Sequence, residues 1–143
     1  MSVVVRRATV ADAAALSALR RDGVADDAFD TSFSEWLAAH VETHLPFVAE
    51  LDGRVVGMAW LFVAARVPSR SRRDRRFGDV QSVYVLPSAR GRGVGAALLA
   101  EVLACAEQLS LEHVTVHSSD RAVSLYTRAG FGQDRTWLRW TPT

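Results

Sequence analysis

The stretch that decides the fold is Val83-Tyr84-Val85-Leu86-Pro87-Ser88-Ala89-Arg90-Gly91-Arg92-Gly93-Val94-Gly95. Its first part closes a strand predicted over residues 77–86, which the following proline ends because it has no N–H group to donate to a sheet. The glycines then open a helix in which apolar side chains recur at helical spacing, namely Val94, Leu98, Val102, Cys105 and Leu109. The sequence therefore predicts a strand, a glycine-rich turn and a helix that packs on the sheet.

The glycine-rich turn has the composition of an anion-binding site. Glycines let backbone N–H groups approach a ligand, and the amides and dipole of a helix N-terminus favour negative charge. Arg90 and Arg92 can add charge-assisted hydrogen bonds to a phosphate. The chain has no lysine, which excludes the Walker pattern, and the spacing of Gly91, Gly93 and Gly95 differs from the dinucleotide fingerprint. The alternative is a purely structural turn with solvated arginines.

The other elements follow from hydrophobic period, caps and turns. Thr9 and Asp12 have the spacing of a capping box, and Asp52-Gly53 is a hairpin turn. In chain order we expect a strand beginning at residues 3–5, helices over 9–23 and about 34–44, strands over 47–51, 54–67 and 77–86, the glycine-initiated helix, a strand over 114–116, a helix capped at 119 or 120 and ended by Gly130, and a strand over 137–140. The order β-α-α-β-β-β-α-β-α-β predicts a mixed α/β class.

Composition limits the class of protein further. The 143 residues fit a single domain, 1–143, with 49% hydrophobic and 23% charged residues. A net charge of +1 gives no bulk attraction to nucleic acid or membrane, and no apolar stretch approaches the ~20 residues that cross a bilayer. Residues 1–7 lack the apolar core of a signal peptide, and the lone Cys105 cannot form a disulfide within the chain. We therefore expect a cytoplasmic protein.

Two motifs in order resemble those of the GNAT superfamily of N-acetyltransferases. Arg90, Gly93 and Gly95 match its acetyl-CoA motif, Arg/Gln-x-x-Gly-x-Gly/Ala, directly after the strand described above. Residues 122–131, Ala-Val-Ser-Leu-Tyr-Thr-Arg-Ala-Gly-Phe, resemble its second motif, A-x-x-L-Y-x-x-x-G-F. The opening segment, residues 5–12, is also similar, so the resemblance spans nearly the whole chain. It implies a GNAT-like fold with a mostly antiparallel central sheet, splayed near Val85 to admit the cosubstrate.

The resemblance also implies a function and a site. The chain would transfer an acetyl group from acetyl-CoA to a primary amine, of a small molecule or a peptide, by direct attack and without a metal. Tyr126 would protonate the leaving thiolate, and the backbone of Val83 and Val85 would pair with pantetheine like an added strand. The residues implied in acetyl-CoA binding are Val83, Tyr84, Val85, Arg90, Gly91, Arg92, Gly93, Val94, Gly95, Ala96 and Ser119.

The chain departs from the family at two positions. Gln81 occupies the place of a glutamate that acts as general base in many relatives, and an uncharged amide cannot take a proton. Asp79, on the same strand face, is a candidate base, with Glu50 and His117 as looser ones and a solvent relay as the alternative. Ser119 stands where the family usually has asparagine, so its hydrogen bonding to pantetheine would be reduced.

Several further features have two interpretations each. The arginine-rich loop over residues 66–76 is either solvated or attracts an anionic substrate or the 3′-phosphate of CoA; nucleic-acid binding is disfavoured. His40 and His44 have a zinc-compatible spacing, but no third ligand is evident.

Other side chains bear on the acceptor and on assembly. Two tryptophans, Trp36 and Trp60, fill core or line an acceptor site, and Asp26, Asp27 and Glu35 are surface acids or bind a cationic amine. Exposed Trp137 and Trp140 would indicate a homodimer. The rival functions are a non-catalytic acyl-CoA sensor, which Gln81 favours, and an interaction domain with a structural glycine turn.

Overall fold

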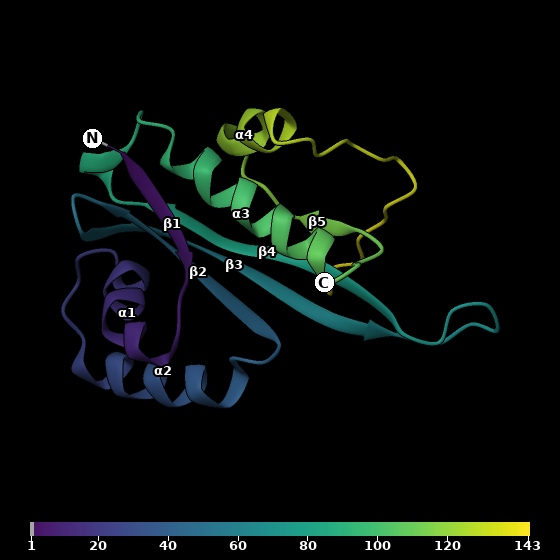
Figure 1. Ribbon diagram of the computed structural model, residues 1–143, viewed down its shortest axis with the longest axis horizontal. Helices are drawn as coiled ribbons and strands as arrows, with labels where there is room; N and C mark the ends of the chain where they lie inside the picture. The colour runs from purple at the N-terminus through teal and green to yellow at the C-terminus, as the bar shows by residue number, and fades with distance from the viewer. Residues whose placement is uncertain (1) are drawn as a thin grey trace.

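The computed structural model describes residues 2–143, which form one five-stranded sheet covered by helices on both faces (Figure 1). The elements in chain order are β1 (Val3–Arg7), α1 (Ala13–Arg21), α2 (Asp27–His40), β2 (His44–Leu51), β3 (Arg54–Arg66), β4 (Arg75–Val85), α3 (Val94–Gln108), β5 (Val114–Val116) and α4 (Val123–Arg128). The strands lie in sequence order; β1 to β4 are antiparallel and β5 joins β4 in parallel. This arrangement confirms the predicted mixed, mostly antiparallel α/β fold.

The two faces of the sheet build two cores. Along β3, Ala59 and Leu61 pack toward α3 and α4, whereas Met58 and Trp60 pack toward α1 and α2. This alternation follows from the two-residue period of a strand, and it lets a β3 that is almost wholly apolar in its middle serve both cores. Figure 1 shows α1 and α2 on one side of the sheet, and α3 and α4 on the other.

The two N-terminal helices begin at polar caps. Thr9 and Asp12 form the predicted capping box, on a short 3-10 turn that leads into α1. For the second helix, the predicted range of residues 34–44 is wrong at both ends. Asp26 caps it by accepting a hydrogen bond of 2.9 Å from the Phe29 amide, so α2 starts at Asp27. The chain then turns after His40, and His44 is the first residue of β2.

Strand β4 contains a bulge at Ser82. The pairing with β3 shifts between Trp60↔Gln81 and Met58↔Tyr84, so β4 has one extra residue there, and Ser82 adopts a left-handed φ of 54°. The extra residue reverses the alternation of side chains. Val83 therefore faces α3, and Tyr84 faces α1.

Strands β4 and β5 pair over only three positions, Gly78↔Val114, Asp79↔Thr115 and Val80↔Val116. Beyond the third pair β4 continues to Val85, while β5 has ended, so the sheet is open along the last residues of β4. This opening is where the splay was expected.

The final strand predicted over residues 137–140 is wrong. Residues 129–143 form no strand, and Trp137, Leu138 and Trp140 are 56%, 90% and 84% exposed. A strand there needs a ladder partner, and β5 is only three residues long. The Trp137 amide instead donates to the Asp134 carbonyl at 3.1 Å, and its ring meets the His113 ring edge to face, with centroids 4.7 Å apart.

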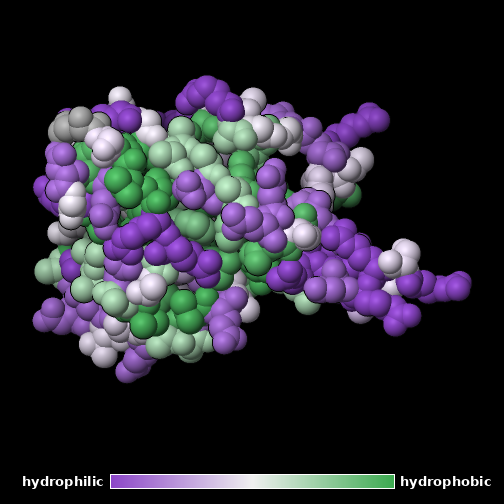
Figure 2. Space-filling model, in the orientation of Figure 1, coloured by the Kyte–Doolittle hydropathy of each residue, from purple (hydrophilic) through white to green (hydrophobic). Residues whose placement is uncertain are grey.

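The hairpin of β3 and β4 extends past the body of the protein as an arm that includes the arginine-rich loop. Figure 2 shows this arm as a hydrophilic projection. At its base Glu112 accepts hydrogen bonds from Arg66 and Arg75, at 3.0 and 2.8 Å. These guanidinium groups lower the pKa of the Glu112 carboxyl to about 2. Part of the arginine-rich loop therefore anchors the arm to the loop before β5.

Candidate active site

The open edge of β4 has backbone groups that no strand uses. The amide of Leu86 donates to the carbonyl of Val56 on β3 at 2.8 Å. Because backbone groups of an antiparallel strand alternate between its two edges, those of Val83 and Val85 point away from β3, into the opening. The Val85 carbonyl accepts a hydrogen bond of 2.9 Å from Arg90 Nε there. The edge can thus receive an extended ligand with amide groups.

The glycine-rich turn follows the open edge directly. Gly91 and Gly93 have φ values of 77° and 78°, in the left-handed region that favours glycine. Gly93 is the N-cap of α3; no side chain caps this helix, and its first turn has no acidic residue. The first-turn amides from Val94 to Ala96 have no acceptor within the helix, so they are free to hold an anion.

The two arginines of the turn are placed differently. Arg90 folds back onto β4, where its guanidinium carbon lies 5.6 Å from the centre of the Tyr84 ring as well as near Val85. Arg92 is exposed at the turn itself. Arg90 therefore fixes the turn against the strand, and Arg92 is the side chain available to a phosphate.

Tyr126 lies on α4 beside the N-terminal half of α3. The two helices approach at Gly95, where an added Cβ would be 3.5 Å from a methyl group of Leu125. Tyr126 is 9% exposed, packs against Phe131 and borders a hollow of about 420 Å³ with Val116 and other residues of β5 and α4. Burial raises the pKa of its phenol, so the hydroxyl stays protonated and can donate.

Ser119 is exposed just before α4. It is the N-cap of a short 3-10 turn, residues 120–122, but makes no side-chain capping bond. Its hydroxyl is thus not committed to the cap.

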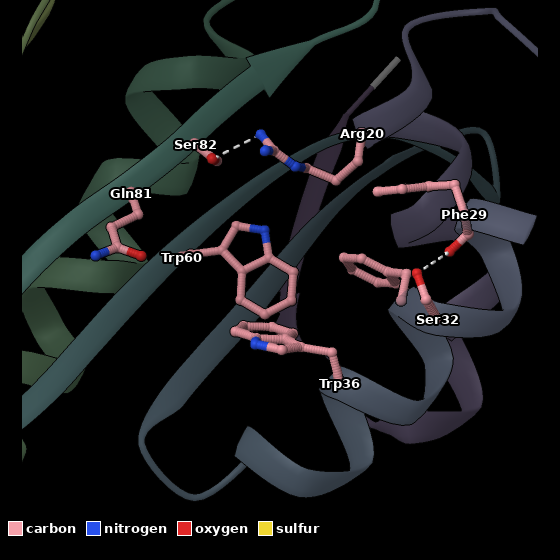
Figure 3. A pocket seen from close by; sticks show the side chains of 8 residues that line it. Arg20, Phe29, Ser32, Trp36, Trp60, Gln81 and Ser82 are labelled. Carbon is pink, nitrogen blue, oxygen red and sulfur yellow. Dashed lines mark hydrogen bonds between the residues drawn. The ribbon is translucent and has the colours of Figure 1, made fainter. Parts of the chain in front are cut away.

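A second hollow lies on the opposite face of the sheet, between α1, α2 and the bulge of β4. It has a volume of about 480 Å³ and is lined by Arg20, Phe29, Ser32, Phe33, Trp36, Trp60, Gln81 and Ser82 (Figure 3). The Trp36 and Trp60 rings meet edge to face with centroids 5.9 Å apart. The two tryptophans singled out from the sequence therefore line one hollow, and Trp60 is also part of the core.

Five of the eight residues that line this hollow were missed by sequence reasoning, namely Arg20, Phe29, Ser32, Phe33 and Ser82. Phe29 and Phe33 precede the residue at which the helix was expected to start, so no helical face included them. Arg20 lies among other charged residues in the sequence, and its role depends on Ser82, 62 positions away, to which its Nη1 donates at 2.8 Å. Only the folded chain brings these two together.

The candidate bases differ in how close they lie to this hollow. Asp79 accepts hydrogen bonds from Thr115 Oγ1 at 2.7 Å and from Gln81 Nε2 at 3.3 Å, which confirms that it shares a strand face with Gln81. Glu50 is paired with Arg6 at the other end of the sheet, and His117 contacts Arg139. Asp79 is thus connected to the hollow through Gln81, whereas the other two are occupied elsewhere.

The remaining candidates do not assemble a site. Asp26 caps α2, and neither Asp27 nor Glu35 lines the aromatic hollow. His40 and His44 lie with ring centroids 5.6 Å apart, yet residues 2–143 contain no group of three side chains able to hold a metal.

Within the same residues no helix is long and apolar enough to cross a membrane.

The fold and the site define a class of protein. An open strand edge that leads to an uncapped, glycine-rich helix N-terminus suits a long ligand with amides at one end and phosphates at the other. Residues 12–131 match the model of the acetyltransferase (GNAT) family. The chain belongs to this family.

Relatives and solved structures agree with the family. A glucosamine 6-phosphate N-acetyltransferase of Trypanosoma brucei brucei is 32% identical over 93 residues, 65% of this chain and 61% of that protein. A mycothiol acetyltransferase of Streptomyces griseus is 39% identical over 88 residues, 59% of this chain and 26% of that protein. The matches thus span about six tenths and a quarter of these relatives.

The fold is also that of two solved structures. The crystal structure of a predicted acetyltransferase with acetyl-CoA from Clostridium acetobutylicum has a TM-score of 0.77 at 18% identity, over 98% of this chain and 96% of that one. A Trypanosoma brucei acetyltransferase has a TM-score of 0.80 at 20% identity, over 99% and 100% of the two chains. At these identities the likeness concerns the fold.

Proposed function

We propose that the protein is an N-acetyltransferase that moves an acetyl group from acetyl-CoA to a primary amine. The observation that carries the proposal is the open edge of β4, which runs from Val83 to the uncapped N-terminus of α3. Membership of the GNAT family supports the choice of donor, as does the fold shared with the Clostridium acetobutylicum structure, which was solved with acetyl-CoA.

The backbone and the glycine turn hold the donor. The outward amide and carbonyl of Val83 and the outward amide of Val85 pair with the amides of pantetheine, as an added strand would, while the Val85 carbonyl accepts from Arg90. The first-turn amides of α3 and the Arg92 side chain bind the pyrophosphate. Tyr84 offers the donor no free hydrogen-bonding group, because its backbone faces β3, its side chain faces α1 and its hydroxyl donates to Asp22. Ser119 completes the donor site with its uncommitted hydroxyl.

The reaction is a direct acyl transfer. The acceptor ammonium first loses a proton, and the neutral nitrogen then attacks the thioester carbonyl carbon. The C–N bond forms, the C–S bond breaks with its electron pair on sulfur, and Tyr126 gives its proton to the thiolate. The phenolate regains the proton that the new amide nitrogen loses, so the products are the acetylated amine, CoA and the proton released at the start.

Asp79 receives the first proton through water. Its carboxylate does not line the aromatic hollow, but Gln81 both lines the hollow and donates to Asp79. A water molecule beside Gln81 therefore connects the amine with a carboxylate.

Calorimetric titration with acetyl-CoA tests the donor site, with Ala96→Glu and Ala96→Gln as a matched pair. Ala96 is exposed in the first turn of α3, where either side chain is tolerated and an acidic one favours the helix itself. The carboxylate repels pyrophosphate, so we expect Ala96→Glu to weaken binding at least about tenfold more than Ala96→Gln. Equal affinities would place the phosphates elsewhere, and no binding by the folded wild type would overturn the function.

A further inference from the structure

Four of the eight residues that line the hollow between α1, α2 and β4 are aromatic. Trp60 and Phe33, 4% and 8% exposed, meet edge to face with centroids 6.0 Å apart and make its floor. Trp36 and Phe29 extend the wall along α2. Figure 3 shows the Trp60 and Trp36 rings below the Arg20 side chain. Binding of a flat or bulky apolar group on such a surface is favourable because it removes apolar area from water.

Arg20 is the one charged side chain among the residues that line this hollow, within the chain from 2 to 143. It reaches from α1 to the bulge of β4, where Nη1 donates to Ser82 Oγ at 2.8 Å (Figure 3). The neighbouring Arg21 is instead paired with Asp30 at 2.7 Å. Because a guanidinium has five N–H donors and is exposed here, Arg20 retains donors for a carboxylate.

Arg20 lies close to the strand edge that is proposed to hold the donor. Ser82 directly precedes Val83, the first residue of the open strand edge proposed to hold the donor. An anion bound by Arg20 would therefore lie beside the thioester, and the apolar body attached to it would lie deeper, among the rings. An amine that must reach the thioester is then separated from its own carboxylate by very few bonds.

We infer that the acceptor is a free α-amino acid with a large apolar or aromatic side chain; this rests on the proposed N-acetyltransferase function. Arg20 binds the α-carboxylate, the four rings cover the side chain, and the α-amine on the same carbon faces the donor. The guanidinium has a second effect. A positive charge beside the amine lowers the pKa of its ammonium, which assists proton loss where glutamine replaces a base.

The lining disfavours two other classes of amine. A polyamine keeps a second cation that needs a carboxylate, and no carboxylate lines the hollow within residues 2–143. A lysine side chain has no α-carboxylate beside its reacting amine for Arg20 to bind. A sugar phosphate, such as the substrate named for the Trypanosoma brucei brucei relative, could use Arg20 but would leave many hydroxyl groups against aromatic rings. Glucosamine 6-phosphate is one arm of the test below, and phenethylamine represents amines without a carboxylate.

The test measures CoA release with four acceptors at saturating acetyl-CoA. L-Phenylalanine has both features, phenethylamine lacks the carboxylate, L-alanine lacks the ring, and glucosamine 6-phosphate replaces the carboxylate by phosphate. The variant is Arg20→Met, which keeps an unbranched apolar stem and removes the guanidinium, and Arg54→Met at the exposed β2–β3 turn is its control. Tryptophan fluorescence with CoA present measures L-phenylalanine binding without turnover.

We expect L-phenylalanine to have a kcat/KM at least about tenfold above the other three. Arg20→Met should lower the kcat/KM for L-phenylalanine by about 10- to 100-fold, because a charge-assisted pair is lost. The kcat/KM for phenethylamine, which has no carboxylate, should not change. The inference would be overturned, with the proposed function intact, if phenethylamine or glucosamine 6-phosphate had a higher kcat/KM than L-phenylalanine. It would also be overturned if Arg54→Met lowered the kcat/KM for L-phenylalanine as much as Arg20→Met does. If fluorescence detected binding of L-phenylalanine but no CoA were released, the hollow would still be a binding site for this amino acid, and the proposed function would be overturned.

Discussion

Replacing Tyr126 by phenylalanine separates catalysis from packing. The substitution removes one hydroxyl and keeps the ring, which stacks edge to face against Phe131 with centroids 5.6 Å apart. The packing of the core cluster is therefore retained. Loss of one hydroxyl at a site 9% exposed should change the free energy of unfolding by no more than about 1 kcal/mol.

The expected effect on rate is much larger. General acid catalysis contributes about 10²- to 10⁴-fold, so the variant should lose about 3 to 5 kcal/mol of transition-state stabilisation. The affinity for acetyl-CoA should change little, because backbone groups and the glycine turn hold the donor. Burial raises the pKa of Tyr126, and the acid form persists until the pH passes that value. The ratio of wild-type to variant rate should therefore be constant from about pH 7 to about pH 9.

The assay is release of CoA thiol at saturating acetyl-CoA, with any amine that the wild type acetylates. Thr127→Val is the control, because it removes a neighbouring hydroxyl that lines the same hollow and donates within α4 to the Val123 carbonyl at 2.9 Å. Calorimetry and thermal melts of both variants report binding and folding. A rate in Tyr126→Phe within about threefold of Thr127→Val would refute the role of Tyr126 as proton donor.

Three other changes have expected outcomes. Asp79→Asn keeps an acceptor for Thr115 and removes the base, so kcat should fall at least about tenfold with unchanged acetyl-CoA affinity by calorimetry; an unchanged kcat would leave the proton to solvent alone. Gly57→Ala places a Cβ at 3.1 to 3.3 Å from a β4 carbonyl and two α3 side chains, which should cost about 1–3 kcal/mol in urea unfolding; a stability equal to wild type would show that α3 can shift away. Burial and a nearby histidine lower the pKa of His44, so the unfolded chain binds more protons and stability should decrease as the pH falls below about 6.5. His44→Gln should flatten that pH dependence, and an unaltered slope would assign it to other groups.

The sequence predicted the parts of the fold that short-range chemistry determines. The capping box at Thr9, the strand that Pro87 follows and the glycine-initiated helix all depend on residues within a few positions of one another. The family resemblance added a mostly antiparallel sheet that is splayed near Val85. The final strand failed because Trp137 and Trp140 have strand-forming side chains but no edge of sufficient length to pair with, a property of β5 and not of the tail.

The aromatic hollow shows the other limit of prediction from the sequence. It requires the bulge at Ser82, which has no signature in the local sequence and becomes visible only as an extra residue opposite β3. It also requires α2 to start at Asp27, so that Phe29 lies on the same helix as Trp36. Contacts between α1 and β4, such as that of Arg20, depend on both and could not be inferred beforehand.

The three-residue pairing of β4 with β5 has a consequence for how the empty protein behaves. So short a ladder leaves β5 and the six-residue α4 weakly held, and regions of this kind open before the rest of a domain. A donor seated along β4 would act as the missing stretch of sheet and join the two halves from within. Binding of the donor and ordering of β5 and α4 are then coupled. Saturation at about 100 times the Kd would add about 2.7 kcal/mol to global stability, and amide exchange should slow most in residues 114–128.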